Sequence, residues 1–411
     1  MTDIFSRYIK SIVFGIIMLI PTTILADEQT SKDAKVNPDS ITDENFVTAS
    51  LLLMEPQNYV ISSMGHICFR MQCPTYGMDY CFTYTLFNKR NEILDMLTGD
   101  LKMGMLRTET EQMLKDNTLS HRGVTEYKLN MPIKAKQNLW RILDERVDEG
   151  CDLNFDYDKR GCAHTALTFI NMAFDTMEIN TIWPDKFKET SRRKLIREAI
   201  GVNTWQTVIL GITFGGSCNA HVEPYESVVI PKDLIEILQA SSVNGTQLLS
   251  SQGTQLVKCS NNTFHSWFSP LVAAIIILLL TIVCEVFQKP YMKYALLTLQ
   301  TVLGVLIIYI IAFTALPFTE WNWLIIPFNP LPALLWKWRG KWQTMYACSL
   351  LIWITAMFFA PYPQTEYHMI ILTSAICAAY FHPHYSTKYT KNSRKLIFRH
   401  HNTLFHNIKT S

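Results

Sequence analysis

The sequence lacks several patterns that would mark common classes of protein. Its 411 residues contain ten cysteines but no Cys-x-x-Cys pair, which argues against a zinc ribbon or a thioredoxin-like site. We find no internal repeat. The net charge is only +2, and the basic residues cluster beside apolar runs, where anionic lipid headgroups are a simpler partner than nucleic acid. We therefore expect no metal, no cofactor and no nucleic-acid partner.

Charged residues make up 18% of the chain and become scarce after Pro270. The second part of the sequence contains four apolar runs with few charges, at 270–287, 294–318, 343–360 and 368–382. Three of these runs are long enough to span a bilayer, and the last is short. This composition predicts a membrane domain over residues 268–384.

The segment 321–338 contains three prolines, which would break a regular helix. A loop is the local interpretation, but the basic residues favour a crossing. They form three clusters: Lys289 and Lys293; Lys337, Arg339 and Lys341; and a tail over 385–411 with six basic residues and no acidic ones. Basic clusters stay in the cytoplasm, and only five crossings put all three there if the first half is exported. We therefore predict a broken third span at 321–338 and a cytoplasmic tail.

The chain begins with the features of an export signal. Arg7 and Lys10 precede an apolar stretch over 11–20, and a cleavage point follows Ala26. An uncleaved anchor helix is the alternative. In both cases residues 27–265 are predicted to form an exported domain, which is large enough for its own core.

Seven of the ten cysteines fall in this exported part, and seven is an odd number. In an oxidising compartment six could pair while one stays free, and the alternative is that several remain reduced. The remaining three lie in apolar runs, where a small apolar side chain is their expected role. The exported cysteines are Cys68, Cys73, Cys81, Cys151, Cys162, Cys218 and Cys259.

Cys162 is the most informative of them, because it directly precedes an apolar run that predicts a helix. The partial positive charge of a helix N-terminus lowers a thiol pKa and favours the nucleophilic thiolate. A cysteine combined with a distant histidine is the minimum set for covalent acyl transfer. His66 lies 96 residues upstream, an order opposite to that of papain. His164 lies two residues after Cys162 and is a weaker candidate, better suited to capping or packing.

Residues 61–70 and 79–87 predict a β-hairpin that turns at 74–77. Alternation places His66 with Cys68 and Arg70 on one face of its strand. A polar residue on the neighbouring strand would orient the His66 ring, and both Tyr84 and Asp79 are candidates between which the sequence does not choose. The alternative is that His66 and Cys162 are ordinary structural residues.

Four short motifs carry a resemblance to a known family. Ser62–Arg70 resembles a Ser-Ser-Phe-Gly-His-x-x-x-Arg signature, and Tyr157–Thr165 resembles a Tyr-x-x-x-Asn-Cys-x-Thr segment. Val229–Leu234 is similar to Phe-Leu-Pro-x-x-Leu. Residues 321–324 and 329–331 resemble the Asn-x-Asn-Leu-Leu and Asn-Pro-Leu of a five-helix membrane domain. Together they resemble the lipoprotein N-acyltransferases of Bacteroides-type bacteria, with two departures: Gly161 replaces an Asn and Met64 replaces a Phe.

The resemblance implies an α+β, permuted papain-like exported domain, similar to lecithin:retinol acyltransferase-like proteins, followed by a helical transmembrane bundle. It implies that Cys162 takes an acyl chain from a membrane phospholipid as a thioester, with His66 moving the proton. The amine of a diacylated lipoprotein would then accept the chain at the periplasmic face of the bacterial inner membrane. The alternatives are an envelope cysteine peptidase or amidase acting on cell-wall peptides, and a non-enzymatic scaffold.

Overall fold

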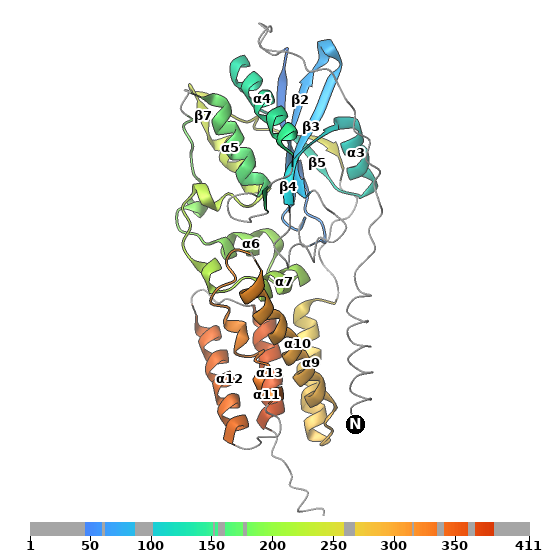
Figure 1. Cartoon of the computed structure of the whole chain (residues 1–411), viewed down its shortest axis with the longest axis vertical. Coiled ribbons are helices and arrows are strands. Elements are labelled where there is room, and N and C mark those ends of the chain that lie inside the picture. The colour runs from blue at the N-terminus through green and yellow to red at the C-terminus, as the bar shows by residue number, and fades with distance from the viewer. Residues whose placement is uncertain are drawn as a thin grey trace, which may run out of the picture. The chain divides into compact units, whose positions relative to one another are not determined.

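The computed structural model describes residues 46–59, 62–86, 102–150, 153–154, 161–175, 179–258, 268–314, 316–334, 341–360 and 366–381. The chain divides into two units, residues 1–40 and 41–411, and every described residue belongs to the second unit. The expected export signal at 1–26 and the basic tail at 385–411 lie outside the described residues. The described chain is a mixed α+β fold with an antiparallel sheet (Figure 1).

A seven-stranded antiparallel sheet forms the centre of the part that spans 46–258, which we call the sheet domain. The spatial order of the strands is β6-β4-β3-β2-β1-β5-β9. A separate two-stranded ribbon pairs β7 (Ser242–Val243) with β8 (Thr246–Gln247). The strands of the main sheet are β1 (Thr48–Met54), β2 (His66–Cys73), β3 (Met78–Leu86), β4 (Lys102–Glu109), β5 (Val124–Lys128), β6 (Leu153–Asn154) and β9 (Thr254–Val257).

The hairpin predicted from the sequence is confirmed. Strands β2 and β3 pair antiparallel from Cys68 opposite Thr83 to Cys73 opposite Met78. The 3₁₀ turn η2 (Pro74–Tyr76) connects them and ends at Gly77, whose φ of 65° is favourable for glycine. Strand β3 continues beyond this ladder and pairs with β4 as far as Leu86.

Each face of the sheet is covered by helices. On one face α4 (Ile133–Glu149) and α5 (Cys162–Phe174) bury a large apolar cluster, whereas α3 (Thr110–Leu119) covers the other face with a smaller one (Figure 1). The alternation of side chains along β2 and β3 decides which residue enters which cluster. Phe69 and Phe82 join the first cluster, while Cys68 and Cys81 join the second.

The chain continues through α6 (Arg192–Ile200), α7 (Trp205–Thr213) and α8 (Pro231–Ala240). The 3₁₀ turn η3 (Asp185–Phe187) precedes α6, and two more, η4 (Gly216–Asn219) and η5 (Tyr225–Ser227), lie between α7 and α8. Ser191 and Thr204 cap α6 and α7 with their hydroxyl oxygens, which fixes where each helix begins.

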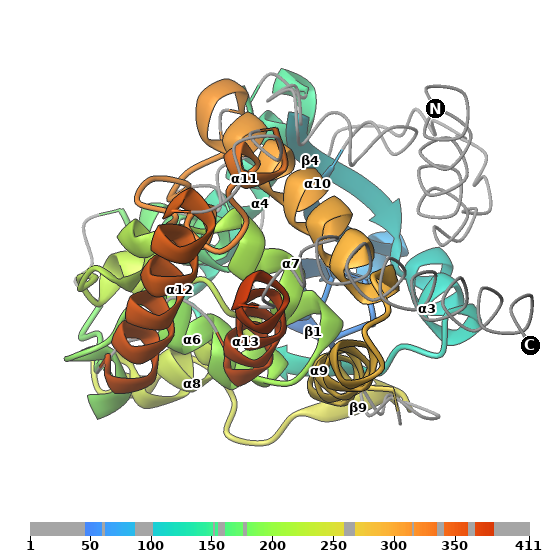
Figure 2. The same cartoon turned by 90° about the horizontal axis from the view of Figure 1, so that it is seen from below.

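The second part of the chain forms a bundle of apolar helices, α9 (Pro270–Val286), α10 (Tyr291–Phe313), α12 (Lys341–Phe359) and α13 (Tyr367–Phe381). Helix α13 contacts α9, α10 and α12, as the end-on view shows (Figure 2). Two of the bundle helices, at Tyr291–Phe313 and Trp342–Phe359, are long and apolar enough to cross a membrane. Helix α9 has 17 residues and α13 has 15, so the structure supports two of the three full-length runs expected from the sequence.

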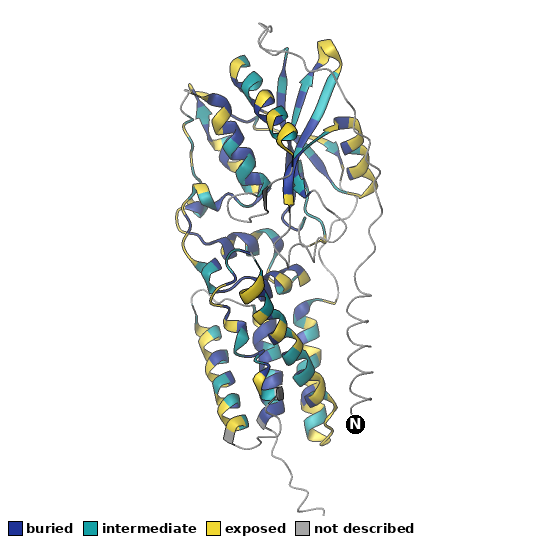
Figure 3. Cartoon of the chain, in the orientation of Figure 1, coloured by how far each residue is buried: buried dark blue, intermediate teal, exposed yellow. Residues whose placement is uncertain are grey.

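The bundle helices expose many residues, drawn in yellow in Figure 3, and large apolar side chains are among them, which is the reverse of a soluble protein. Only 28% of the apolar window of α10 and 17% of that of α12 is buried. Large aliphatic side chains of α9 point outward, and contiguous exposed surface of this kind marks a membrane or protein contact. The outward residues of α9 include Ile275, Ile276, Leu279, Leu280 and Val283.

The segment predicted to be a broken span is largely non-helical where it is described, with only the turn η6 (Trp323–Ile325) and the four-residue α11 (Leu331–Leu334). It is packed between α10 and α12. Gly304 of α10 lies so close to it that an added Cβ would sit 1.8 Å from the Phe328 carbonyl oxygen. Irregular backbone at such a place requires partners for its carbonyl groups.

Side chains of the neighbouring helices supply those partners. Trp353 Nε1 donates to the Trp323 carbonyl at 3.0 Å. Tyr346 Oη donates to the carbonyls of Ile326 at 2.8 Å and Pro327 at 3.0 Å. Gln300 Nε2 donates to the Asn329 carbonyl at 2.8 Å. The segment therefore runs antiparallel to α12 along about two helical turns.

Three contacts show which end of the bundle faces the sheet domain. The Leu271 N–H at the start of α9 donates to Asn203 Oδ1 at 3.1 Å. Glu366, just before α13, forms an ion pair with Arg197 of α6. The Gly215 N–H donates to the carbonyl of Phe318, after α10, at 2.7 Å. Helices α9 and α13 therefore both run away from the sheet domain, and α13 ends at the opposite end of the bundle.

Candidate functional site

His66 begins β2, and the glycine before it makes that placement possible. Gly65 has a φ of +86°, and a Cβ at this position would lie 2.9 Å from the Met54 carbonyl oxygen. A side chain here would meet both the left-handed backbone and a fixed carbonyl. Gly65 therefore lets the chain turn closely after β1, so that His66 pairs opposite Met54.

Thr83 contacts the His66 ring from the neighbouring strand. His66 Nε2 lies 2.7 Å from Thr83 Oγ1 across the hairpin. If Nε2 carries the proton and donates to this oxygen, Nδ1 is the nitrogen that can accept the thiol proton. Sequence reasoning did not select Thr83. The signal was available in the hairpin register, because Thr83 pairs with Cys68, two residues from His66.

The structure does not bring Asp79 to His66. Asp79 pairs opposite Gln72, six residues along β2 from His66, which corresponds to about 20 Å of strand. Its carboxylate instead accepts two hydrogen bonds from Arg70, at 2.8 and 2.5 Å, and one from Thr110 at 2.6 Å. Burial raises the pKa of Asp79, but the hydrogen bonds from Arg70 and Thr110 outweigh it and lower the pKa overall. Asp79 is therefore part of a structural ion pair.

Tyr84 is buried in the cluster beneath α4 and α5, with 8% of its surface exposed. It precedes Thr85 and follows Thr83 in β3, so alternation directs its side chain to the face opposite that of Thr83. Neither Asp79 nor Tyr84, the two candidates for orienting His66, holds the position on β3 beside the His66 ring that Thr83 takes.

Cys162 is the first residue of α5, as predicted. Apolar residues at helical spacing hold α5 against the sheet: Ala163, Ala166, Leu167, Ile170 and Phe174 are all buried. The residue before the helix, Gly161, has no side chain to cap it. The first N–H groups of α5 are therefore available to other acceptors.

The Cys162 thiol uses these groups and one more from the sheet. The backbone N–H groups of Ile67, Ala163 and Cys162 donate to its sulfur. The β2–β3 ladder ends at Cys68 and Thr83, so the Ile67 N–H lies where the two strands separate. Because Ile67 follows His66, this contact places the Cys162 sulfur one residue along β2 from His66.

Burial raises the pKa of the Cys162 thiol, although hydrogen bonds from Ile67 and Ala163 and the charge of Arg122 act in the opposite direction. The expectation that the helix N-terminus would lower this pKa is therefore wrong, because desolvation disfavours the anion more strongly. The resting site holds a thiol, and its proton has to be removed when the sulfur attacks.

Sequence reasoning missed a second residue, Arg122, in the loop between α3 and β5. Its Nε donates to the Glu55 carbonyl at 2.7 Å. A hydrogen bond with Cys81 and burial raise the pKa of Cys68, and burial raises that of Cys162; the charge of Arg122 opposes both shifts without reversing them. Only the strand order reveals this proximity, because Met54 pairs with His66 on one side and with Val124 on the other.

His164 has the packing role expected of it. Its ring lies edge-on to Tyr225, with 4.9 Å between the ring centroids. Tyr225 also contacts Thr168 one turn further along α5, at 3.0 Å between the hydroxyl oxygens. These contacts fix α5 to the segment around η5.

The described cysteines of the sheet domain are all free thiols: Cys68, Cys73, Cys81, Cys162 and Cys218. Of the two alternatives that the sequence left open, the structure matches the one in which several cysteines stay reduced. Cys151 and Cys259 lie outside the described residues. Cys284 and Cys348 in the bundle are partly or fully exposed, and Cys377 is buried.

The loop that follows β1 connects the site to the bundle. Gln206 of α7 donates to the Asn58 carbonyl at 2.7 Å. One residue earlier, Trp205 Nε1 donates to the Phe268 carbonyl, just before α9, at 3.0 Å. The edge of the sheet that carries His66 is therefore two side-chain contacts away from the first bundle helix.

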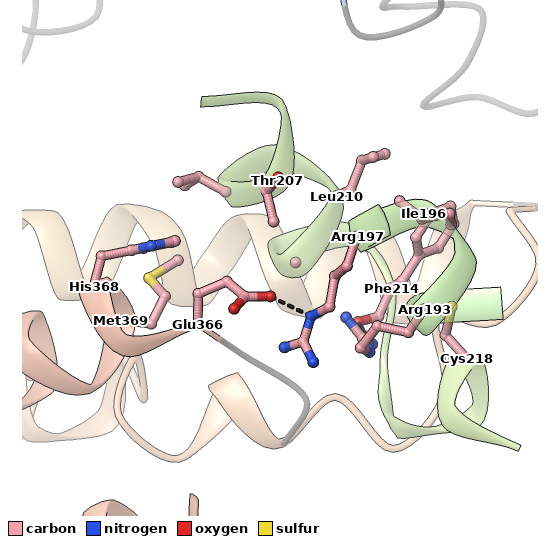
Figure 4. Close-up of a pocket in the computed structure, with 12 residues that line it drawn as sticks. Arg193, Ile196, Arg197, Thr207, Leu210, Phe214, Cys218, Glu366, His368 and Met369 are labelled. Carbon is pink, nitrogen blue, oxygen red and sulfur yellow. Dashed lines mark hydrogen bonds and ion pairs between the residues drawn. The ribbon is translucent and has the colours of Figure 1, made fainter. Parts of the chain in front are cut away.

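A pocket between α6, α7 and α13 lies on the same route (Figure 4). Its two arginines already have partners. Arg197 pairs with Glu366, and Arg193 donates to Asn219 Oδ1 at 2.6 Å and to the Phe214 carbonyl at 2.8 Å. With a cavity volume of about 20 Å³, it has room for roughly one water molecule. We assign this pocket a structural role in joining the sheet domain to the bundle.

Among the described residues, no group of three or more His, Cys, Asp or Glu side chains is placed to hold a metal ion. No protein-family model, no curated protein and no solved structure matches the chain. The chemistry of the site must therefore be argued from its own geometry.

Proposed function

We propose that this protein is a membrane-bound lipoprotein N-acyltransferase with a permuted papain-like sheet domain. The observation that carries the proposal is the Cys162 thiol at the start of α5, hydrogen-bonded to Ile67 beside a His66 that Thr83 orients. A strand-borne histidine beside a cysteine at a helix start is suited to acyl transfer through a thioester. The motif resemblance described above names the substrates.

The first half-reaction forms the thioester. The Cys162 sulfur attacks an ester carbonyl of a phospholipid, and its proton passes to His66 Nδ1 as the S–C bond forms. The tetrahedral intermediate then collapses, and the alcohol oxygen of the lysophospholipid takes the proton from the imidazolium. Removal of the proton during the attack suits a thiol whose pKa is raised by burial.

The second half-reaction transfers the chain. The neutral α-amine of a diacylglyceryl-cysteine attacks the thioester and gives a proton to His66. His66 passes this proton to the sulfur, and Cys162 leaves as the thiol. An amide replaces the thioester. Both substrates are lipids, and the apolar outer faces of α9, α10 and α12 support a site beside a bilayer.

Five passes through the bilayer, with residues 27–265 in the periplasm and 385–411 in the cytoplasm, belong to the same proposal. Its support is that α9 and α13 both run away from the sheet domain. The packed segment at 323–334 then supplies the pass between α10 and α12. Because α9 and α13 are short, they would cross where the bilayer is thin or locally compressed.

The test is the intact mass of purified enzyme mixed with phospholipid vesicles. We expect a population heavier by one acyl chain, released by neutral hydroxylamine, together with one equivalent of lysophospholipid. The adduct should be absent from Cys162→Ala and present in Cys218→Ala, the matched control at a buried thiol. A peptidase or amidase would show no acyl adduct from phospholipid, and a scaffold would leave Cys162 inert to acyl donors.

A further inference from the structure

Arg122 is fixed in place beside the site by contacts that do not use its whole guanidinium. Its N–H donates to the Asn117 carbonyl at 2.8 Å, and its Nε donates to the Glu55 carbonyl at 2.7 Å. Glu55 in turn donates its N–H to the Gly123 carbonyl at 2.9 Å. A Cβ on Gly123 would lie 2.6 Å from the Glu55 side chain, so glycine permits this close approach.

The strand register places this loop beside His66. Met54, at the end of β1, pairs with His66 on one side and with Val124 on the other. Neighbouring strands lie about 4.8 Å apart, so the backbones of His66 and Val124 are separated by about 10 Å. Arg122 lies two residues before Val124, and its guanidinium is close enough to the Cys162 thiol for each group to shift the pKa of the other.

One nitrogen of the Arg122 guanidinium, Nη2, is buried and has no hydrogen-bond partner among the described residues. Burial lowers the pKa of Arg122 to about 10, and the acidic groups that act in the opposite direction are the thiols of Cys162 and Cys68. An unsatisfied buried donor costs about 1–3 kcal/mol, more when charged, so such a group calls for a ligand.

The donors that the thiol uses among the described residues are backbone N–H groups. Gly161, directly before Cys162, has no side chain to add another, and the first N–H groups of α5 are directed at the sulfur. An acyl carbon bonded to this sulfur carries an oxygen that becomes negative in the tetrahedral intermediate. Charge-assisted donors are the strongest partners for such an oxygen.

We propose that Arg122 is a catalytic residue whose Nη2 donates to the carbonyl oxygen of the acyl group attacked by Cys162. As the S–C bond forms, the carbonyl π electrons move to this oxygen, and Arg122 stabilises the negative charge until the carbonyl re-forms. The proposal rests on thioester chemistry at Cys162 but not on which lipid supplies the acyl chain.

The experiment compares two reactions of the same thiol in Arg122→Gln and wild type. Alkylation by iodoacetamide needs the thiolate but creates no oxyanion, whereas acylation by a p-nitrophenyl ester needs both. We expect Arg122→Gln to slow acylation by about 10²–10³-fold, the usual effect of losing one oxyanion donor. Alkylation should slow by less than about tenfold, the effect of one pKa unit on the thiolate population. Arg107→Gln, at an arginine paired with Asp144, is the matched control.

Equal slowing of both reactions, or slowing of neither, would overturn the proposal. So would a loss restricted to phospholipid donors, because the guanidinium would then bind the lipid phosphate. If Arg122→Gln does not fold, Arg122→Ala with added methylguanidine gives the same test, and we expect the added cation to restore acylation. A wild type that reacts with the nitrophenyl ester but not with phospholipid would refute the proposed function and leave the role of Arg122 measurable.

Discussion

Replacement of Thr83 by valine tests the orientation of His66 with little other disturbance. Valine keeps the shape and the β-branching that suit a strand, and it removes only the hydroxyl that lies 2.7 Å from His66 Nε2. Thr83 is half-buried, so the substitution leaves no sizeable cavity. Thr83→Ser keeps the hydroxyl and serves as the matched control.

The size of the effect follows from the loss of one hydrogen bond. Such a bond contributes about 0.5–1.5 kcal/mol, which corresponds to roughly 2- to 13-fold in rate. We expect kcat/KM for acylation of Cys162 to fall by this factor in Thr83→Val and to stay near wild type in Thr83→Ser. The free energy of unfolding should change by less than about 1 kcal/mol.

A double-mutant cycle completes the assay. In a His66→Ala background the valine substitution should have no further effect, because Thr83 acts through the imidazole. An equal loss in both backgrounds would show that Thr83 supports the fold rather than the ring, and the reasoning would be refuted.

Four further outcomes are expected. Cys162→Ser and His66→Ala should each abolish acyl transfer, and single-turnover rates should show the double variant little worse than either. Losses that multiply in the double variant would mean that the two residues act independently. The rate of Cys162 alkylation by iodoacetamide should still rise above pH 9.0, the ordinary pKa of a thiol, because burial raises the pKa of Cys162. A rate that levels off near pH 6 would indicate a preformed thiolate–imidazolium ion pair. Gly304→Leu should destabilise the bundle by at least about 1–3 kcal/mol in a detergent melt, since even a Cβ would meet the Phe328 carbonyl at 1.8 Å, and an unchanged melt would contradict the packed segment. Alkaline phosphatase fused at Ser411 should be inactive, and activity there would mean an even number of spans.

Local patterns in the sequence predicted the elements that carry the site. The turn at 74–77 fixes the register of the hairpin, and the apolar spacing after Cys162 sets the start of α5. Both are short-range properties of the chain. The helix α10 was expected to reach 318 but ends at Phe313. The Phe318 ring packs instead against Arg192, with 4.5 Å between the ring centroid and the guanidinium carbon. A hydropathy pattern does not reveal such a contact.

The details of the site depend on register and burial, which the sequence does not display. Asp79 was a reasonable partner for His66 until the register placed it beside Arg70. Thr83 carries no pattern of its own, and Arg122 reaches the site only because β5 pairs with β1. The direction of the Cys162 pKa shift could not be predicted from the sequence, because it depends on burial, whose effect on the thiolate exceeds that of the helix dipole.

The most direct test of acyl transfer through Cys162 is the mass of a lipoprotein N-terminus made by cells. A reporter lipoprotein would be isolated from cells that produce wild-type protein, Cys162→Ser or the control Cys218→Ala, and its N-terminal peptide measured by mass spectrometry. The account predicts a third acyl chain on the α-amine with wild type and Cys218→Ala, and a diacylated peptide with a free amine with Cys162→Ser. A triacylated N-terminus in the Cys162→Ser cells, or a diacylated one in all three, would contradict it.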